Sequence, residues 1–233
     1  MGSKAKFAKE ILDIILKDRT EGQWYVEPFA GGMNTISRVT GNRIANDSHP
    51  YLMAMWKSLL NLDWKPDYIS QEKYTEVRLN KDKFPNDIVG WIGFVCTFSG
   101  GFFKGYAGKT LKKTGKVYDY QQMQRNNIFK QIPNVKGIEL RNMNYQDLDI
   151  PDNSIIYCDP PYQGTSSYSN SKDFDHDEFW AWCRYMSWKG HTVFISEYNA
   201  PPDFECIWSK DVKVSLSTFD IKDKTEKLFR YKL

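Results

Sequence analysis

The chain has 233 residues, of which 41% are hydrophobic and 26% charged, with a formal net charge of +3. These values exclude wholesale disorder and fit one α/β domain with an insertion. The longest apolar stretch, residues 88–98, is too short to cross a bilayer, and residues 1–6 do not begin a secretory signal. The four cysteines and three histidines are not spaced as zinc ligands. We therefore expect a cytoplasmic protein with reduced thiols and no metal.

Strands and helices alternate along the predicted structure. We expect helices over residues 5–17, 50–62, 88–98, 118–132 and 177–189, the fourth of which ends at Pro133. We expect short strands at 24–29, 42–47, 137–141, 154–158 and 191–196, and two closing strands at 210–219 and 226–232. Residues 34–39 are predicted to start a helix, 65–84 to be helical in pieces, and 99–117 to be a loop. This alternation implies a mostly parallel sheet covered on both faces, to which the closing strands add an antiparallel edge.

Basic residues are concentrated between residues 99 and 136. This stretch holds eight Lys or Arg residues and one acid, a charge of +7, so the rest of the chain sums to −4. A local basic stretch on a nearly neutral protein is typical of contact with a polyanion, although a solvated lysine-rich loop has the same composition. The basic residues are Lys104, Lys109, Lys112, Lys113, Lys116, Arg125, Lys130 and Lys136, and the acid is Asp119.

A glycine turn follows the first predicted strand, in residues 26–32 with the sequence Val-Glu-Pro-Phe-Ala-Gly-Gly. Glycines at the carboxyl end of a strand let the backbone approach a ligand closely, but a purely structural turn has the same pattern. Neither G-x-G-x-x-G nor the complete P-loop pattern G-x-x-x-x-G-K-[ST] is present, which excludes those two nucleotide-binding motifs. Asp47 ends the next strand, where an acid typically accepts hydrogen bonds from ribose hydroxyls, and it is also suited to cap the helix that starts at Pro50.

The most specific pattern is Ile-Ile-Tyr-Cys-Asp-Pro-Pro-Tyr, at residues 155–162. A buried strand delivers Asp159, and the two prolines that follow fix their φ angles and donate no hydrogen bonds. The Asp159 carboxylate and a free backbone carbonyl beside it form a pair of acceptors for an exocyclic NH2 group. The ring of Tyr162 can stack on a flat base. If this segment were only a turn that ends a strand, the order of the glycine turn, Asp47 and Asp159 along the chain would be unexplained.

With these motifs in this order, the chain resembles the Dam-like family of DNA adenine-N6 methyltransferases, the branch common in phages and restriction–modification systems. Residues 2–4 are similar to the family's N-terminal cofactor motif, 27–32 to its methyl-donor loop, 144–147 to the acidic turn beside the cofactor adenine, and 159–162 to its D-P-P-Y motif. The resemblance implies an α/β, Rossmann-like methyltransferase fold with S-adenosyl-L-methionine as methyl donor. The chain departs from the pattern at Met33, where a glycine is frequent, and ahead of Lys4, where many members carry an aromatic residue.

The resemblance also implies a division of the chain and roles for individual residues. Residues 1–62 and 134–233 are expected to form the catalytic domain and 63–133 an inserted target-recognition region, in a monomer or weak dimer that binds double-stranded DNA. Expected cofactor ligands are Lys4, Glu27, Pro28, Phe29, Ala30, Gly31, Gly32, Asp47, Asp147 and Asp159. Expected catalytic residues are Asp159, Pro160 and Tyr162, and expected DNA contacts are Lys104, Lys109, Lys112, Lys113, Lys116 and Tyr168.

A mechanism follows from these residues. The N6 atom of adenine is a poor nucleophile because its lone pair is delocalised into the ring. Hydrogen bonds to the Asp159 carboxylate and the Pro160 carbonyl favour a tetrahedral nitrogen, to which the methyl group passes in line from the sulfonium. The base must leave the duplex, at a cost of a few kcal/mol of unstacking, and Tyr162 then holds it by stacking. We expect residues 163–174, with Tyr168, to form a loop that closes over the flipped base.

Three alternatives stay open. D-P-P-Y also suits cytosine-N4 methylation, because both bases offer an exocyclic amine. RNA methylation is a second alternative. The third is a catalytically inactive nucleic-acid-binding module, although such a module would typically have lost Asp159 or Asp47.

Overall fold

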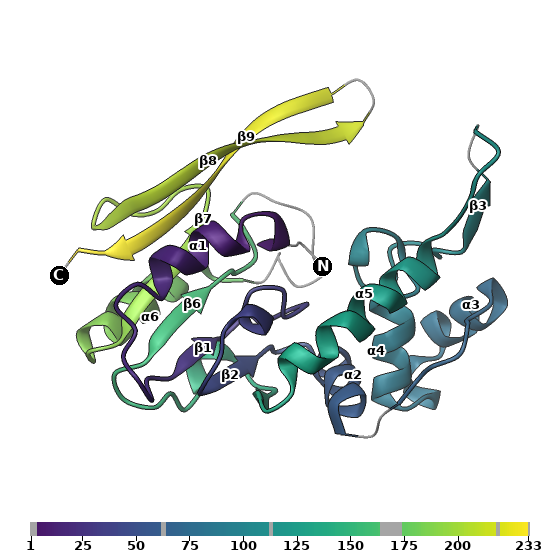
Figure 1. The fold of residues 1–233 in the computed structure, drawn as a ribbon, viewed down its shortest axis with the longest axis horizontal. Helices are drawn as coiled ribbons and strands as arrows, with labels where there is room; N and C mark the ends of the chain where they lie inside the picture. Colours follow the sequence, from purple (N-terminus) through teal and green to yellow (C-terminus); the bar gives the residue numbers. More distant parts are fainter. Residues whose placement is uncertain (1–3, 62–63, 112–113, 164–173, 218–219, 233) are drawn as a thin grey trace.

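A seven-stranded sheet lies at the centre of the protein (Figure 1), whose computed structural model describes residues 4–61, 64–111, 114–163, 174–217 and 220–232. The first five strands in sheet order are parallel, and the last two are antiparallel to their neighbours. In sheet order they are β5 (Glu139–Arg141), β2 (Arg43–Asn46), β1 (Tyr25–Glu27), β6 (Ile155–Cys158), β7 (Thr192–Glu197), β9 (Asp220–Tyr231) and β8 (Phe204–Ser217). The predicted α/β class, with its parallel sheet and antiparallel edge, is confirmed.

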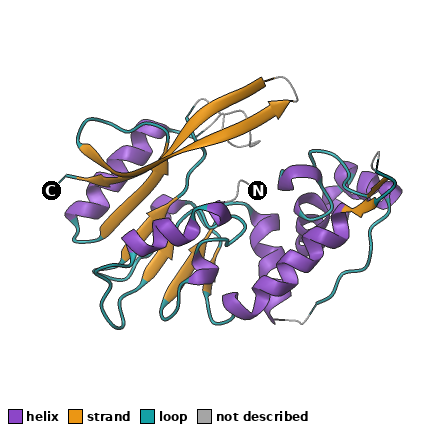
Figure 2. Ribbon diagram, turned by 45° about the horizontal axis from the view of Figure 1, so that its top comes forward, coloured by secondary structure: helices purple, strands orange, loops and turns teal. Residues whose placement is uncertain are grey.

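Both faces of the sheet are buried, because successive residues of a strand point to opposite sides. In β1, Tyr25 belongs to one hydrophobic cluster and Val26 to the other. The same alternation in β6 separates Ile155 from Ile156. Helices flank the sheet in Figure 2. The first cluster contains residues of α1 (Ala8–Ile15) and α2 (Pro50–Asn61), and the second contains residues of α6 (His176–Trp188).

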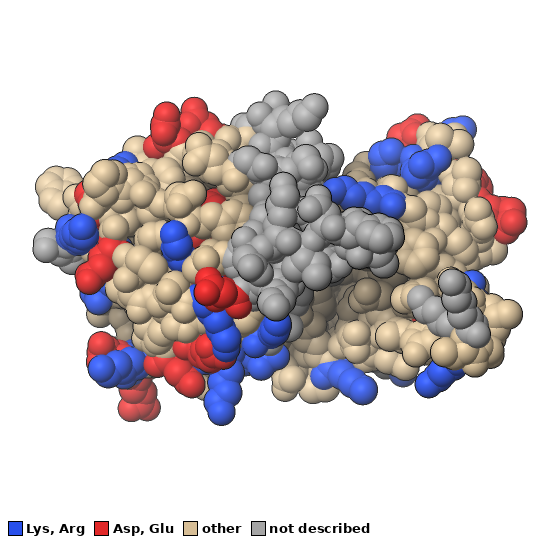
Figure 3. All heavy atoms as spheres, turned by 90° about the horizontal axis from the view of Figure 1, so that it is seen from above, with Lys and Arg blue, Asp and Glu red and all other residues tan. Residues whose placement is uncertain are grey.

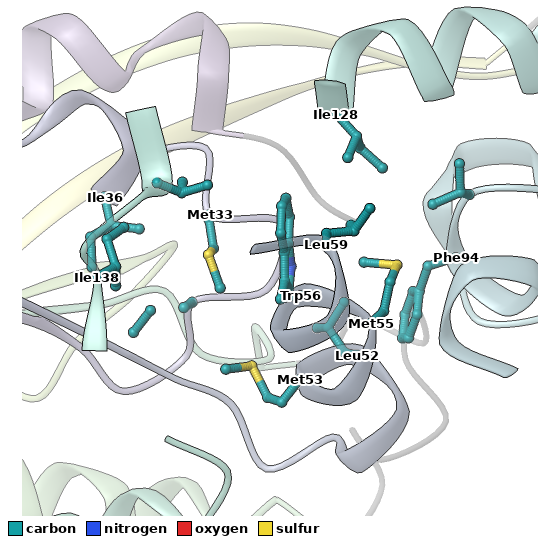
Figure 4. Close-up of a cluster of buried hydrophobic side chains, with 14 of the residues drawn as sticks. Met33, Ile36, Leu52, Met53, Met55, Trp56, Leu59, Phe94, Ile128 and Ile138 are labelled. Atoms are coloured by element: carbon teal, nitrogen blue, oxygen red, sulfur yellow. The ribbon is translucent and has the colours of Figure 1, made fainter. Parts of the chain in front are cut away.

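Beside the sheet, three helices and a small hairpin form a second group of elements, on the right in Figure 1. Helix α2 joins the two groups: Trp56 and Met55 are fully buried, and Figure 4 shows them between Met33 on the sheet side and Phe94 on the helical side. The main core therefore runs without a break from the sheet into the helices. The elements of this group are α3 (Gln71–Leu79), α4 (Asn86–Phe94), β3 (Lys109–Leu111), β4 (Val117–Asp119) and α5 (Tyr120–Val135).

The prediction of a loop over residues 99–117 was wrong. Within it, β3 pairs antiparallel with β4, so that Lys109 lies opposite Asp119 and Leu111 opposite Val117. Gly115 sits in the connection with a φ of 74°, a conformation that favours glycine. All three residues of β3 are exposed, so no apolar alternation marks the strand in the sequence.

The prediction that Pro133 ends a helix was also wrong, because α5 continues to Val135. A proline removes only one helical hydrogen bond, and the buried side chain of Val135 holds the last turn against the core. Residues 34–39, predicted to start a helix, form only the short 3-10 turn η2 (Ile36–Arg38). Strand β8 begins at Phe204, six residues before the predicted start at Lys210.

Arg43, at the start of β2, connects the sheet to the end of α5. Its Nη1 atom donates hydrogen bonds to the carbonyls of Val39, at 2.7 Å, and Asn134, at 2.8 Å. Its Nη2 atom donates to the carbonyl of Lys136, at 3.1 Å. The charged side chain is therefore buried against three backbone carbonyls, from both the sheet side and the end of α5.

Replacement of Arg43 with alanine is expected to lower the free energy of unfolding by about 1–2 kcal/mol, because partly buried carbonyls lose a charged donor. Urea denaturation measures this change. The control is Arg78→Ala, which removes an exposed arginine from α3. An equal loss in both variants would contradict the proposed link between sheet and helix.

None of the helices in the described parts of the chain combines the length and apolar character needed to span a membrane.

Candidate active site

A cavity of about 840 Å³ opens at the carboxyl ends of β1, β2 and β6, where open α/β sheets bind ligands. Its size suits an organic cofactor and part of a second molecule. Most of the residues singled out in the sequence meet there. The cavity is lined by Lys4, Glu27, Pro28, Phe29, Ala30, Gly31, Gly32, Asp47, Lys104, Asp159, Pro160 and Tyr162, among others.

The glycine turn after β1 is held in place from three directions. Asp47 accepts a hydrogen bond from the backbone N–H of Gly31, at 3.1 Å, while Trp56 Nε1 of α2 donates to the Gly31 carbonyl, also at 3.1 Å. From α5, Gln131 Nε2 donates to the carbonyl of Met33, at 2.8 Å. The turn is therefore rigid before any ligand binds, as close backbone recognition requires.

Met33 adopts the left-handed conformation that made glycine the expected residue, with a φ of 54°. This conformation costs a residue with a Cβ roughly 1–2 kcal/mol. The side chain is fully buried, and Figure 4 shows it directed toward Trp56 in the core. Packing thus offsets the backbone strain, so the turn keeps its shape without the glycine.

Asp47 connects the glycine turn to the residue that precedes α2. Its Oδ1 atom accepts the backbone N–H of His49, at 2.9 Å, ahead of the first turn of α2, and its Oδ2 atom accepts the N–H of Gly31. Burial raises the pKa of the carboxyl group, and these two hydrogen bonds act in the opposite direction. Because each carboxylate oxygen has a second lone pair, Asp47 can also accept from a ligand hydroxyl in the cavity.

Asp159 follows β6 directly and faces the cavity, with 26% of its side chain exposed. Burial raises its pKa; the ammonium group of Lys4, whose Nζ lies 3.5 Å from Oδ1, lowers it, and the nearby Glu226 raises it again. Glu27, at the end of β1, is a second buried acid in this region. Burial also raises its pKa, and its Oε1 atom accepts a hydrogen bond from Tyr25, at 2.9 Å.

Tyr162 and Tyr198 form one wall of the cavity. Their rings meet edge to face, with centroids 4.6 Å apart. Behind them, Glu197 accepts the backbone N–H groups of Gln163, at 3.1 Å, and Tyr198, at 2.7 Å, which joins the end of the D-P-P-Y segment to the end of β7. Burial raises the pKa of Glu197 to about 7. Tyr198 and Glu197 were not singled out in the sequence, although their place at a strand's carboxyl end is a usable signal.

At the other end of the cavity, aromatic rings cluster beside two acids. The ring of Phe29 lies 5.2 Å from that of Tyr145 and 5.8 Å from that of Phe174. Asp175 and Glu178 complete this end. Such a group of rings beside hydrogen-bond acceptors can hold a flat heterocycle that carries an amino group.

Asp147 does not line the cavity. The 3-10 turn η5 (Tyr145–Asp147) leaves Asp147 exposed and directs Tyr145 into the second core cluster. From this turn, Asn144, Tyr145 and Gln146 line the cavity instead.

Residues from the helical group form the cavity wall beyond Asp47. His49 packs edge to face on Phe94, with centroids 4.9 Å apart, and on Phe102, at 4.6 Å. Burial lowers the pKa of His49 to about 4, so its ring is neutral. Lys104 also lines this wall, and His49 and Phe102 carry no sequence pattern that identifies them as site residues.

The remaining predicted DNA contacts lie away from the cavity or outside the described residues. Lys109 and Lys116 flank the hairpin of β3 and β4, and their ammonium groups lie over the rings of Tyr68 and Tyr118, 5.6 Å from each centroid. In Figure 3, Lys and Arg side chains are spread over the right-hand part of the molecule, which contains the helical group. Lys112, Lys113, Tyr168 and most of the predicted closing loop, residues 164–173, lie outside the described residues.

The described residues contain no group of three or more His, Cys, Asp or Glu side chains placed to hold a metal ion.

Comparison with known proteins adds two findings. The family model for D12 class N6 adenine-specific DNA methyltransferases matches residues 1–89 and 93–187. Among solved structures, the chain is similar to SMU.472 in complex with SAH, with 12% sequence identity and a TM-score of 0.37. That match covers 98% of this chain and 53% of the other, so this chain spans about half the length of SMU.472.

Proposed function

Because the chain belongs to the D12 class N6 adenine-specific DNA methyltransferase family, we propose that it transfers a methyl group from S-adenosylmethionine to the N6 atom of an adenine in double-stranded DNA. One observation carries the proposal: the carboxylate of Asp159 faces the same cavity as the glycine turn and Asp47. A site for a nucleoside-containing donor and a pair of amine acceptors therefore share one space.

The donor side of the cavity fits S-adenosylmethionine, which supplies a methyl group bound to a positively charged sulfur. Asp47 would accept hydrogen bonds from the ribose hydroxyls, and the rings around Phe29 and Tyr145, at the other end of the cavity, would hold the adenine. The rigid turn at residues 27–32 brings its backbone close to the donor. The acids Glu27 and Asp159 favour a positive charge in this part of the cavity.

On the acceptor side, Asp159 and Pro160 position the target amine. The carboxylate and the Pro160 carbonyl accept the two N6–H groups, so the nitrogen lone pair points away from them. Tyr162 holds the ring of the base, which leaves the duplex at a cost of a few kcal/mol. Positioning and preorganised acceptors account for the catalysis, without a covalent intermediate on the protein.

The helical group is proposed to bind the DNA. Residues 1–62 and 134–233 are then the catalytic domain and residues 63–133 an inserted recognition region, whose described basic residues include Lys104 at the cavity and Lys109 and Lys116 on the hairpin. Lysines contact phosphates, which position the duplex without reading its sequence.

A double replacement of Lys109 and Lys116 with alanine is expected to flatten the salt dependence of DNA binding. Each phosphate neutralised adds a slope of about −0.9 to the plot of log affinity against log salt, so the double variant loses up to about two units. Fluorescence anisotropy at several salt concentrations measures the slope. The control pair is Lys9→Ala with Lys17→Ala, two exposed lysines at α1. An unchanged slope would remove the hairpin from the DNA surface.

One incubation tests the proposed function. The protein is mixed with S-adenosylmethionine labelled in its methyl group and with duplex DNA or RNA, and the nucleosides are then separated. N6-methyladenine from DNA is the expected product. N4-methylcytosine, labelled RNA, or binding without any labelled product would each favour one of the alternatives. Methylation-sensitive sequencing of DNA from an expressing host identifies the target, and a short fixed sequence is expected of a phage or restriction–modification enzyme.

A further inference from the structure

Glu226 reaches the candidate active site from the far end of the chain. It lies in β9, one residue before Lys227, which pairs with Glu197 of β7. Strand β7 is the neighbour of β6, which leads into Asp159. Figure 1 shows the purple start of the chain close to the hairpin of β8 and β9, where this carboxylate meets Lys4.

Three groups of the site converge around the Glu226 carboxylate. Its Oε2 atom accepts hydrogen bonds from Lys4 Nζ, at 2.6 Å, and from the Tyr162 hydroxyl, at 3.1 Å. Lys4 also donates to the Tyr162 hydroxyl, and its Nζ atom lies 3.5 Å from Asp159 Oδ1. The side chains of Lys4 and Glu226 are only 10% and 15% exposed, so solvent screens these contacts weakly.

The ammonium group of Lys4 is shared unequally between two carboxylates. It forms ion pairs with both Glu226 and Asp159, and it lies closer to Glu226. Although burial lowers the pKa of Lys4, the two carboxylates outweigh burial and raise it, so the side chain stays charged. Without the charge of Glu226, the ammonium group would be expected to move to Asp159, which is its other ion-pair partner among the described residues.

We propose that Glu226 is a positioning residue for methyl transfer: it holds the Lys4 ammonium closer to its own carboxylate than to that of Asp159, and it accepts the hydrogen bond of the Tyr162 hydroxyl. The Asp159 carboxylate, which lies near Lys4 and Tyr162, then keeps lone pairs for the amino group of the target base. The role rests on the proposed function, because it assigns a purpose to Asp159 as an amine acceptor.

The first test measures turnover for Glu226→Gln, which keeps an acceptor for Tyr162 but removes the charge. We expect kcat to fall between about tenfold and a hundredfold, since displaced reacting groups cost rates of this order. The matched control is Glu10→Gln, which breaks an exposed ion pair between α1 and Lys210 of β8, at 2.5 Å, away from the cavity. Equal turnover in the two variants and the wild type would overturn the proposal.

The second test measures the pKa of Asp159, which separates positioning from a general structural effect, and its spectroscopic readout requires no activity. Glu226 raises the pKa of Asp159, so its removal is expected to lower that pKa and to move the acidic limb of the kcat/KM profile to lower pH. The carboxyl signal of Asp159, identified in protein labelled with carbon-13 aspartate by its loss in Asp159→Asn, reports this pKa directly. Among the described residues, the other charged or titratable groups near Asp159 are Lys4, Glu27, Tyr157, Tyr162 and Glu197, and none of them is substituted in the variant.

The outcomes distinguish the two proposals. A wild type that methylates no nucleic acid would refute the proposed function, while a lower Asp159 pKa in Glu226→Gln, absent from Glu10→Gln, would still support the electrostatic interaction between the two acids. An unchanged Asp159 pKa would overturn the role of Glu226. If circular dichroism shows that Glu226→Gln does not fold, Glu226→Asp is used in its place. For this variant we expect kcat to fall while the acidic limb of the kcat/KM profile stays in place. Turnover equal to that of the wild type would overturn the proposal.

Discussion

Replacement of Asp159 with alanine is expected to lower kcat by on the order of a hundredfold or more, because the amine loses one of its two preorganised acceptors. The substitution is expected to leave the fold intact. Asp149→Ala is a matched control, since Asp149 is exposed and lies outside the cavity. Methyl transfer to duplex DNA measures kcat, and circular dichroism checks the fold. A folded variant with near-normal turnover would refute the assignment of Asp159.

The pKa of Asp159 makes a second outcome of this substitution predictable. Its folded-state pKa is raised above the ordinary value, chiefly by burial. An acid whose pKa is raised on folding binds its proton more tightly in the folded protein, so it stabilises the fold at low pH. This contribution is lost as the pH rises through the folded-state pKa. Above that pKa the ionised side chain therefore opposes folding. We expect Asp159→Ala to unfold at an equal or higher temperature than the wild type.

Replacement of Asp47 with alanine is expected to weaken the binding of S-adenosylmethionine by roughly 1.5–3 kcal/mol, the range for hydrogen bonds to a charged group. Two losses contribute: the acceptor for the ribose hydroxyls, and the hydrogen bond that fixes Gly31 in the glycine turn. Isothermal titration calorimetry without DNA measures the affinity. Unchanged affinity would leave Asp47 with the role of a cap at the start of α2 and no role in the donor site.

A control variant separates the loss of a structural hydrogen bond near a helix start from the loss of a side chain that contacts the cofactor. Ser70 caps α3 by accepting the backbone N–H of Lys73, at 3.2 Å, and it does not line the cavity. Ser70→Ala is expected to lower the melting temperature without changing the affinity for S-adenosylmethionine. Asp47→Ala is expected to change both.

The sequence by itself determined the features that depend on neighbours along the chain. Apolar runs such as residues 155–158 indicate strands buried on both faces, and polar or glycine-rich segments at their ends indicate where ligands can approach. The carboxyl ends of parallel strands meet at one edge of a sheet. Asp47, Asp159 and the glycine turn could therefore be assigned to one cavity before their distances were known.

Local patterns could not resolve elements whose stability comes from packing. Helix α5 passes Pro133 because the core holds Val135, and β3, whose residues are all exposed, pairs with β4 without any apolar alternation. Met33 keeps the conformation expected of a glycine for the same reason. In each case a tertiary contact outweighs the local preference of the residue.

Only the tertiary structure decided which distant side chains complete the site. Glu226 and Lys4 are 222 positions apart, and they meet because β9 pairs with β7 at the antiparallel edge of the sheet. His49 joins the cavity because Phe94 and Phe102 of the helical group pack on its ring. Asp147 lies outside the cavity because one short turn directs it to solvent. Sheet pairing and the direction of a side chain depend on the whole fold, so no spacing along the chain encodes them.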